Sequence, residues 1–285
     1  MAHWKLGIDG GSTLNCDLAR QIEIVGTQGY DYLEVRDCDL AAYLKTHSIE
    51  DVNQAFQNQG VKPICMSAIE LKILQPGESD KDIFEKTEWL LEMGAEIGCP
   101  LALAAHLPPT PGDLSRKQVI QRVCDDLLRV SDLAAKYEMN IPYEFLGSPQ
   151  CPIFNIEDTM EVIEKVNRDN IGWLFDIYHF HLTDRNVSAL AKAGNRKLML
   201  VHLTDVKDLP MEQLYVPCSR RALPGQGISD TEGIVRTLHS IGYAGPFVIE
   251  LYDAEYLTWK PEEIAAKARE SALEVLKKFF SSPKV

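Results

Sequence analysis

The sequence predicts an α/β fold made of one domain, a closed (β/α)8 TIM barrel. Short apolar segments alternate with longer amphipathic segments, and strict β-then-α alternation indicates a parallel sheet covered by helices. Eight such units fit into the 285 residues, close to the ~250 residues typical of a closed barrel. No linker, low-complexity tract or repeat interrupts them. We therefore expect a single domain over residues 1–285, with a frayed tail at 281–285.

The predicted elements follow one another in strict order. Strands are expected at 4–8, 30–36, 61–67, 100–106, 141–145, 172–176, 197–202 and 246–251. Helices are expected at 17–27, between 40 and 58, and at 79–97, 115–137, 157–167, 187–192, 230–240 and 261–280. An open doubly wound sheet is the rival fold, but it more often has fewer units and a nucleotide-binding glycine loop. The segment IDGGST after the first strand lacks the spacing of such a P-loop.

Composition and charge narrow the function classes. The 42 acidic and 29 basic residues give a formal net charge of −13, which repels phosphate backbones and anionic headgroups. We therefore expect a small-molecule substrate, with no nucleic acid and no membrane as partner. The N-terminal residues lack a signal-peptide pattern, and no apolar run approaches the ~20 residues of a membrane span. Seven scattered cysteines without a C-x-x-C pair indicate reduced thiols, so a cytoplasmic protein is expected.

The ends of the last four strands carry the strongest functional signal. In a (β/α)8 barrel, chemistry takes place at the C-terminal ends of the strands. Strands five to eight end in Glu144, Asp176, His202 and Glu250. Side chains on one face of a strand recur at every second residue, so these four are expected to point into one barrel mouth.

Three carboxylates in one barrel mouth repel one another unless a cation lies between them. Together with one imidazole they form an oxygen-rich set, which suits Mn2+, Mg2+ or Co2+, with Zn2+ also compatible. A lone acidic residue at a strand end is more often a helix N-cap or a solvated loop residue. Four metal-competent residues in equivalent positions are harder to explain in that way. The sequence therefore predicts one divalent metal ion held by Glu144, Asp176, His202 and Glu250.

Three further histidines lie near the predicted strand ends and are considered for contact with a substrate. His179 follows Asp176 by three positions and is expected to reach over the metal towards a substrate oxygen. His181 is at least as well explained as a hydrogen-bonding loop residue. His106 ends the fourth strand, where it is a candidate for donating a hydrogen bond to the substrate at the rim.

Two segments that contain an arginine are weaker candidates for substrate binding. In the second strand, Glu34 and Arg36 alternate with two apolar residues. If the apolar pair packs against helices, the charged pair points into the barrel and forms either an ion pair or a substrate contact. The segment RALPGQG, at 221–227, has the glycines and proline of a turn that approaches a ligand closely, and Arg221 is a candidate to anchor it.

At these residues the sequence resembles the xylose-isomerase-like barrels of sugar isomerases and epimerases, which carry a Glu, Asp, His, Glu metal set on strands five to eight. Within this family the likeness is greatest to the inosose isomerases. The stretches that carry it lie between residues 29 and 256: GYDYLEVR, YLKTHSIEDV, EFLGSPQC, VNRDNIG, FDIYHFH, RALPGQG and VIELYDAEY. His106 and the loop TDVKDLPMEQLYVPCSRR depart from the pattern. Because such loops set specificity, the substrate is less firmly implied than the chemistry.

The resemblance implies a metal-dependent isomerase that converts 2-keto-myo-inositol to 1-keto-D-chiro-inositol through an enediolate. It implies that Glu144 and Glu250 transfer the proton from opposite sides of the metal, while Asp176 and His202 mainly hold the ion. It also lends His179 a substrate contact and Arg221 a supporting role. A homodimer is compatible with the resemblance.

Other functions remain open for the same fold. Ketose 3-epimerisation and inosose dehydration can use the same site. An abasic-site endonuclease of this fold uses several metals and more histidines, which the charge and the four ligands disfavour. A non-catalytic, metal-stabilised sugar-binding barrel is the hypothesis without an enzyme.

Overall fold

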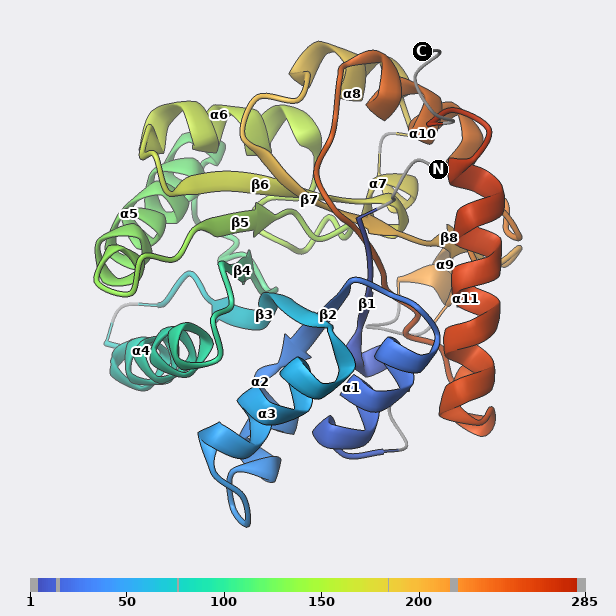
Figure 1. The fold of residues 1–285 in the computed structure, drawn as a ribbon. Coiled ribbons are helices and arrows are strands. Elements are labelled where there is room, and N and C mark those ends of the chain that lie inside the picture. The colour runs from blue at the N-terminus through green and yellow to red at the C-terminus, as the bar shows by residue number, and fades with distance from the viewer. Residues whose placement is uncertain (1–4, 14–15, 76, 184, 216–219, 281–285) are drawn as a thin grey trace.

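A closed barrel of parallel strands forms the centre of the computed structural model, which describes residues 5–13, 16–75, 77–183, 185–215 and 220–280 (Figure 1). The barrel order is β1-β10-β7-β6-β5-β4-β3-β2. Its strands are β1 Leu6–Asp9, β2 Tyr32–Arg36, β3 Lys62–Leu71, β4 Leu101–His106, β5 Ile141–Glu144, β6 Ile171–Asp176, β7 Leu198–Leu203 and β10 Phe247–Ile249. The predicted (β/α)8 barrel is confirmed, whereas the predicted tail at 281–285 lies outside the described residues.

Helices surround the barrel, as the sequence periodicity predicts (Figure 1). They are α1 Leu18–Thr27, α2 Asp37–Tyr43, α3 Ile49–Gln59, α4 Lys81–Glu96, α5 Arg116–Ala135, α6 Ile156–Val166, α8 Val187–Ala193, α10 Thr231–Ser240 and α11 Pro261–Leu276. Local caps fix where several of them begin. Asp17 accepts a hydrogen bond from the Arg20 backbone N–H, and Ser48 and Asp51 form a capping box at α3. These helices match the predicted order to within a few residues at their ends.

Apolar side chains lie in two layers on either side of the strands. The outer layer, between the strands and the helices, includes Leu33 and Val35 of β2. The inner layer, inside the barrel, includes Leu174, Leu200 and Val248. Because side chains alternate along a strand, the residue two positions after an inner apolar residue also points inwards.

Short elements on the loops after β6 and β7 were not predicted. The helix α7, Ile177–Leu182, begins directly after β6, and the two-residue strands β8, Asp205–Val206, and β9, Arg221–Ala222, form an antiparallel pair. A further short helix, α9, spans Met211–Leu214. Figure 1 shows α7, β8 and α9 on the same side of the barrel. Among the described residues, no helix is both long and apolar enough to cross a membrane.

Candidate metal centre and active site

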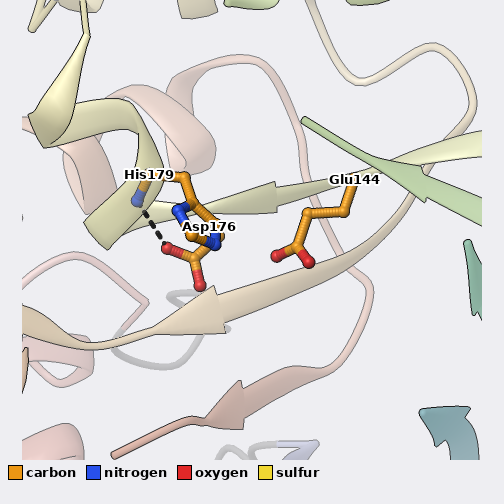
Figure 2. Close-up of side chains that lie close together, drawn as sticks. All are labelled: Glu144, Asp176 and His179. Carbon is orange, nitrogen blue, oxygen red and sulfur yellow. Dashed lines mark hydrogen bonds between the residues drawn. The ribbon is translucent and has the colours of Figure 1, made fainter. Parts of the chain in front are cut away.

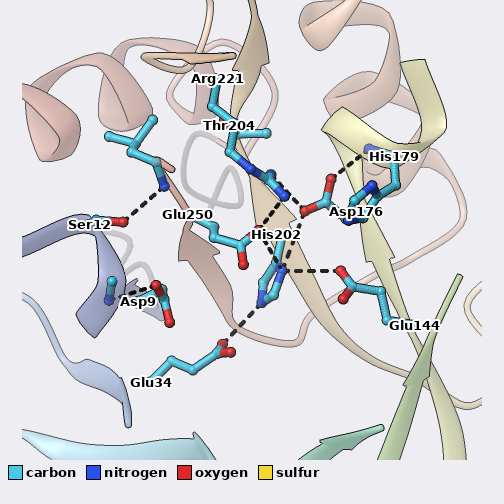
Figure 3. Close-up of polar contacts among 12 residues, drawn as sticks. Asp9, Ser12, Glu34, Glu144, Asp176, His179, His202, Thr204, Arg221 and Glu250 are labelled. Carbon is cyan, nitrogen blue, oxygen red and sulfur yellow. Dashed lines mark hydrogen bonds and ion pairs between the residues drawn. The ribbon is translucent and has the colours of Figure 1, made fainter. Parts of the chain in front are cut away.

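The four predicted metal ligands converge inside the barrel. The Nδ1 atom of His202 lies 3.4 Å from one carboxylate oxygen of each of Glu144, Asp176 and Glu250. Asp176 and His202 are fully buried, and Glu144 and Glu250 are nearly so. Figure 3 shows the four side chains pointing towards one another from neighbouring strands. The structure therefore brings together the whole predicted ligand set.

Strand alternation explains this convergence. Asp176, His202 and Glu250 each follow an inner apolar residue of their own strand by two positions. Glu144 ends β5 and follows Tyr143, which packs in the outer layer. The strands that carry these four residues are adjacent in the order β10-β7-β6-β5. Their inward side chains consequently meet on one side of the barrel.

The pKa values of Glu144, Asp176 and His202 all differ strongly from their usual values. Burial raises the pKa of Glu144 to about 7, although His202 acts to lower it. Burial alone would raise the pKa of Asp176, but the charge of Arg221, together with the neighbouring His179 and His202, outweighs burial and holds this pKa well below its usual range. For His202, burial lowers the pKa, but the carboxylates of Glu250 and Glu34 outweigh it and raise the pKa well above normal.

The cluster fits a divalent metal ion. Within the described part of the chain, Glu144 Oε1 and His202 Nδ1 are buried without a hydrogen-bond partner, although buried polar atoms normally have one. A zinc ion with ligands at about 2.1 Å in a tetrahedron separates its ligand atoms by about 3.4 Å. The three N···O separations from His202 Nδ1 are 3.4 Å. The donor set of three carboxylates and one imidazole suits Zn2+, Mn2+ or Co2+.

Asp176 is also the N-cap of α7. Its Oδ1 atom accepts a hydrogen bond of 2.8 Å from the backbone N–H of His179 (Figure 2), and its Oδ2 atom faces His202. The cap holds the His179 ring beside Asp176 and Glu144, where ligand atoms of all three lie within 4.8 Å of one another. Burial lowers the pKa of His179 to about 4, so the ring is neutral near pH 7. Its buried Nδ1 atom has no hydrogen-bond partner among the residues that the structure describes.

Arg221 reaches the cluster from β9. One guanidinium nitrogen lies 2.8 Å from Asp176 Oδ2, and the other lies 2.5 Å from Glu250 Oε2. The guanidinium also stacks over the ring of Tyr178 in α7, 4.7 Å from its centroid. Arg221 therefore orients two of the candidate ligands and partly neutralises them. Its predicted supporting role towards substrate stays a prediction.

Glu34 and Arg36 have separate partners. The outward packing of Leu33 and Val35 turns Glu34 into the barrel, where its Oε2 atom lies 3.0 Å from His202 Nε2. Arg36, at the end of β2, forms two hydrogen bonds with Asp39 of α2. The structure thus joins Glu34 to the metal cluster and leaves Arg36 outside it.

The structure does not bring His106 and His181 into the cluster. His106 is in the outer layer, with one ring nitrogen 3.2 Å from Asp126 of α5 and the other 3.2 Å from the Tyr143 hydroxyl. His181 is buried in α7, and burial lowers the pKa of its ring to about 4. Substrate contact by His106 therefore has no support from its placement.

Asp9 is a further buried acidic residue at a strand end, and it was not among the predicted site residues. It ends β1, is fully buried, and pairs in register with Glu34. Its Oδ1 atom accepts a hydrogen bond from the Gly11 backbone N–H, and Tyr252 interacts with the same carboxyl group. Figure 3 shows Asp9 on the same side of the cluster as Glu34. Asp9 lies in the segment IDGGST at the end of the first strand, and this strand-end position is the sequence feature that could have identified it.

Comparisons with known proteins agree with this architecture over almost the whole chain. A family model described as a xylose isomerase-like TIM barrel matches residues 22–279. The inosose isomerase of Bacillus velezensis is 30% identical over 278 residues, covering 97% of this chain and 98% of that protein. A 3-dehydroshikimate dehydratase of Pseudomonas aeruginosa is 23% identical over 85% of this chain and 37% of its own length.

A solved structure extends the similarity to three dimensions. The crystal structure of the IOLI protein with a binding zinc atom superposes with a TM-score of 0.91 at 30% identity. The match covers 98% of this chain and 100% of that one.

Proposed function

Because the chain belongs to the xylose isomerase-like TIM barrel family, we propose that it is a divalent-metal-dependent isomerase acting on an inosose. The reaction moves the ketone to the neighbouring carbon and converts 2-keto-myo-inositol to 1-keto-D-chiro-inositol. The observation that carries the proposal is the convergence of three carboxylate oxygens at 3.4 Å from His202 Nδ1. The similarity to the Bacillus velezensis inosose isomerase supports the choice of substrate.

Glu144, Asp176, His202 and Glu250 are the residues that would hold the ion. A bound divalent cation supplies Lewis-acid stabilisation of the negative charge that develops on the substrate oxygens. The similar IOLI structure has a binding zinc atom, which supports a bound divalent ion, with Zn2+, Mn2+, Co2+ and Mg2+ as candidates. Asp176 mainly holds the ion in place, because its second oxygen already accepts the hydrogen bond that caps α7.

Glu144 and Glu250 are the groups we assign to proton transfer. The isomerisation removes a proton from the carbon beside the ketone and returns one to the former carbonyl carbon. A hydroxyl proton passes between the two substrate oxygens, so the overall composition is unchanged. A carboxylate held within reach of the reacting carbon can accept this proton and return it to the neighbouring carbon. Among the four ligands, Glu144 and Glu250 come from the two outermost strands, β5 and β10.

His179 and Arg221 are the proposed substrate-binding residues. The unpartnered Nδ1 atom of His179 lies at the edge of the cluster and can bond to a substrate hydroxyl. Arg221 lies against two ligands and keeps their carboxylates in place for the reaction.

The direct test of the proposal is product identification. Metal-loaded protein is incubated with 2-keto-myo-inositol, and the products are followed by 13C NMR and ultraviolet absorption. We expect 1-keto-D-chiro-inositol without a new absorbing species. An absorbing conjugated product instead indicates dehydration, the activity named for the Pseudomonas aeruginosa relative with its own substrate. Absence of any conversion with Mn2+, Zn2+, Co2+ or Mg2+ overturns the proposed activity.

A further inference from the structure

The contact between Glu34 and His202 crosses the interior of the barrel. Glu34 lies on β2 and His202 on β7, 168 positions apart in the sequence. Two strands, β1 and β10, lie between them in the barrel order. Both side chains are fully buried, and the Oε2···Nε2 distance is 3.0 Å. Figure 3 shows the carboxylate on the side of the imidazole away from Glu144 and Asp176.

The two nitrogens of His202 therefore face different surroundings. Nδ1 faces the three carboxylate oxygens of the proposed ligand set, whereas Nε2 faces Glu34. A neutral imidazole carries one N–H, and an ionised carboxylate can only accept a hydrogen bond. When Glu34 accepts from Nε2–H, the lone pair of the ring lies on Nδ1. A metal ion needs that lone pair.

We propose that Glu34 is a positioning residue that fixes the tautomer and ring orientation of His202 for metal binding. This inference rests on the proposed metal site. A metal-bound histidine commonly donates its other ring N–H to a carboxylate, and loss of that partner lowers metal affinity about 10–100-fold. Because Leu33 and Val35 pack outwards, the face of β2 that carries Glu34 is fixed. The carboxylate of Glu34 therefore stays directed into the barrel.

The proposal differs from a substrate contact in what it predicts. A positioning residue changes the affinity for the ion and leaves the KM for substrate nearly unchanged once the site is saturated with metal. Loss of a substrate contact instead raises the KM and leaves the affinity for the ion nearly unchanged. The two roles are therefore separable by measuring metal affinity and KM on the same variants.

The experiment compares Glu34→Ala and Glu34→Gln with the wild type. Affinity for Zn2+ is measured by competition with a chromophoric chelator, and KM is measured at saturating Zn2+. Glu70→Gln is the matched control, because Glu70 lies on the neighbouring strand β3 with an exposed side chain. We expect Glu34→Ala to lose about 10–100-fold in Zn2+ affinity and Glu34→Gln to lose less, since its amide oxygen can still accept from Nε2–H. The control should bind Zn2+ as the wild type does.

NMR of the zinc-loaded protein gives a readout independent of turnover. The wild type should show an Nε2–H proton of His202 protected from exchange with water, and Glu34→Ala should lose that protection. Equal Zn2+ affinity in wild type and Glu34→Ala overturns the inference, as does a raised KM with unchanged affinity. Failure of the wild type to bind Zn2+ contradicts the proposed metal site itself. If Glu34→Ala does not fold, the nearly isosteric Glu34→Gln carries the test.

Discussion

Asp176 shows how one side chain can serve local structure and chemistry together. One oxygen caps α7 through the backbone N–H of His179, and the other faces His202 and Arg221. The ordinary role of a strand-end acid as a helix cap is therefore real, but it uses only one of the two oxygens. The capped helix in turn holds His179 beside the cluster. At this position the structural role supports the chemical one.

Proton transfer by Glu144 leads to a prediction at a single residue. Glu144→Gln keeps the size of the side chain but removes the base, so we expect turnover to fall at least about 100-fold with little change in thermal stability. The exposed Glu164 of α6 provides the control Glu164→Gln, which should retain full turnover. Wild-type kcat in Glu144→Gln would remove Glu144 from the proposed proton transfer.

The pKa of Glu144 predicts a pH dependence of metal binding. In the metal-free protein its pKa is about 7, so Glu144 is protonated at lower pH and must lose a proton when an ion binds. Affinity for Mn2+ should therefore fall as the pH drops below 7. Calorimetry in buffers of different ionisation enthalpy should find about one more proton released at pH 6 by the wild type than by Glu144→Gln. Equal proton release by the two proteins would contradict this assignment.

At the scale of elements, the short helix α7 depends on close packing with the loop after β5. A Cβ atom added at Gly147 would lie 2.5 Å from the carbonyl oxygen of His179 and 2.8 Å from its Cα atom. No side chain larger than hydrogen fits there unless α7 moves. The loop and the helix thus set the position of the His179 ring together.

We predict that Gly147→Ala displaces α7 and raises the KM for substrate several-fold, because His179 moves away from the substrate. Gly112→Ala is the matched control, since a Cβ atom there meets nothing within 4 Å. Steady-state kinetics at saturating metal distinguish the two variants. An unchanged KM in a folded Gly147→Ala protein would argue against substrate contact by His179.

The sequence predicts the main elements better than the loops. Alternation of apolar residues predicts β5, β6, β7 and β10 with their inward-pointing ends, because each strand has enough residues to show its period. The helix α7 and the pair β8–β9 are too short for periodicity to reveal. Arg221 reaches the cluster only because that pair forms, and a sequence does not show this.

The placements of His106 and Glu34 could not be predicted from local pattern, for two different physical reasons. The expected rim position of His106 does not fit the alternation of β4, since Ala104 and Ala102, two and four residues earlier, pack in the outer layer. The contact between Glu34 and His202 follows from barrel closure, which brings residues 168 positions apart together. Local pattern contains no information on such a pair.

For the whole molecule, barrel closure concentrates acidic groups that the nearby Arg221 and His202 neutralise only in part. Asp9, Glu34, Glu144, Asp176 and Glu250 are all buried on the inner side of the barrel. Arg221 is the cation of an ion pair with two of them. A divalent ion adds the positive charge that this buried set lacks, so folding and metal binding should be coupled.

This coupling predicts a metal-dependent stability. An ion at 100 times its Kd stabilises the folded state by about 2.7 kcal/mol. For a domain of this size the melting temperature should rise by roughly 5–10 °C. Dialysis against a chelator should lower the melting temperature, and Mn2+ or Zn2+ should restore it. The variant Asp176→Asn should show a smaller rise, whereas Glu164→Gln should match the wild type.

The most direct test of the whole account is a titration of metal-stripped protein with Mn2+, in which bound metal and turnover of 2-keto-myo-inositol are measured in the same samples. We predict negligible turnover without metal and an activity that rises in proportion to occupancy until one ion is bound per chain. Full turnover by the metal-free protein, or binding of Mn2+ without any turnover, would contradict a metal-dependent isomerase at Glu144, Asp176, His202 and Glu250.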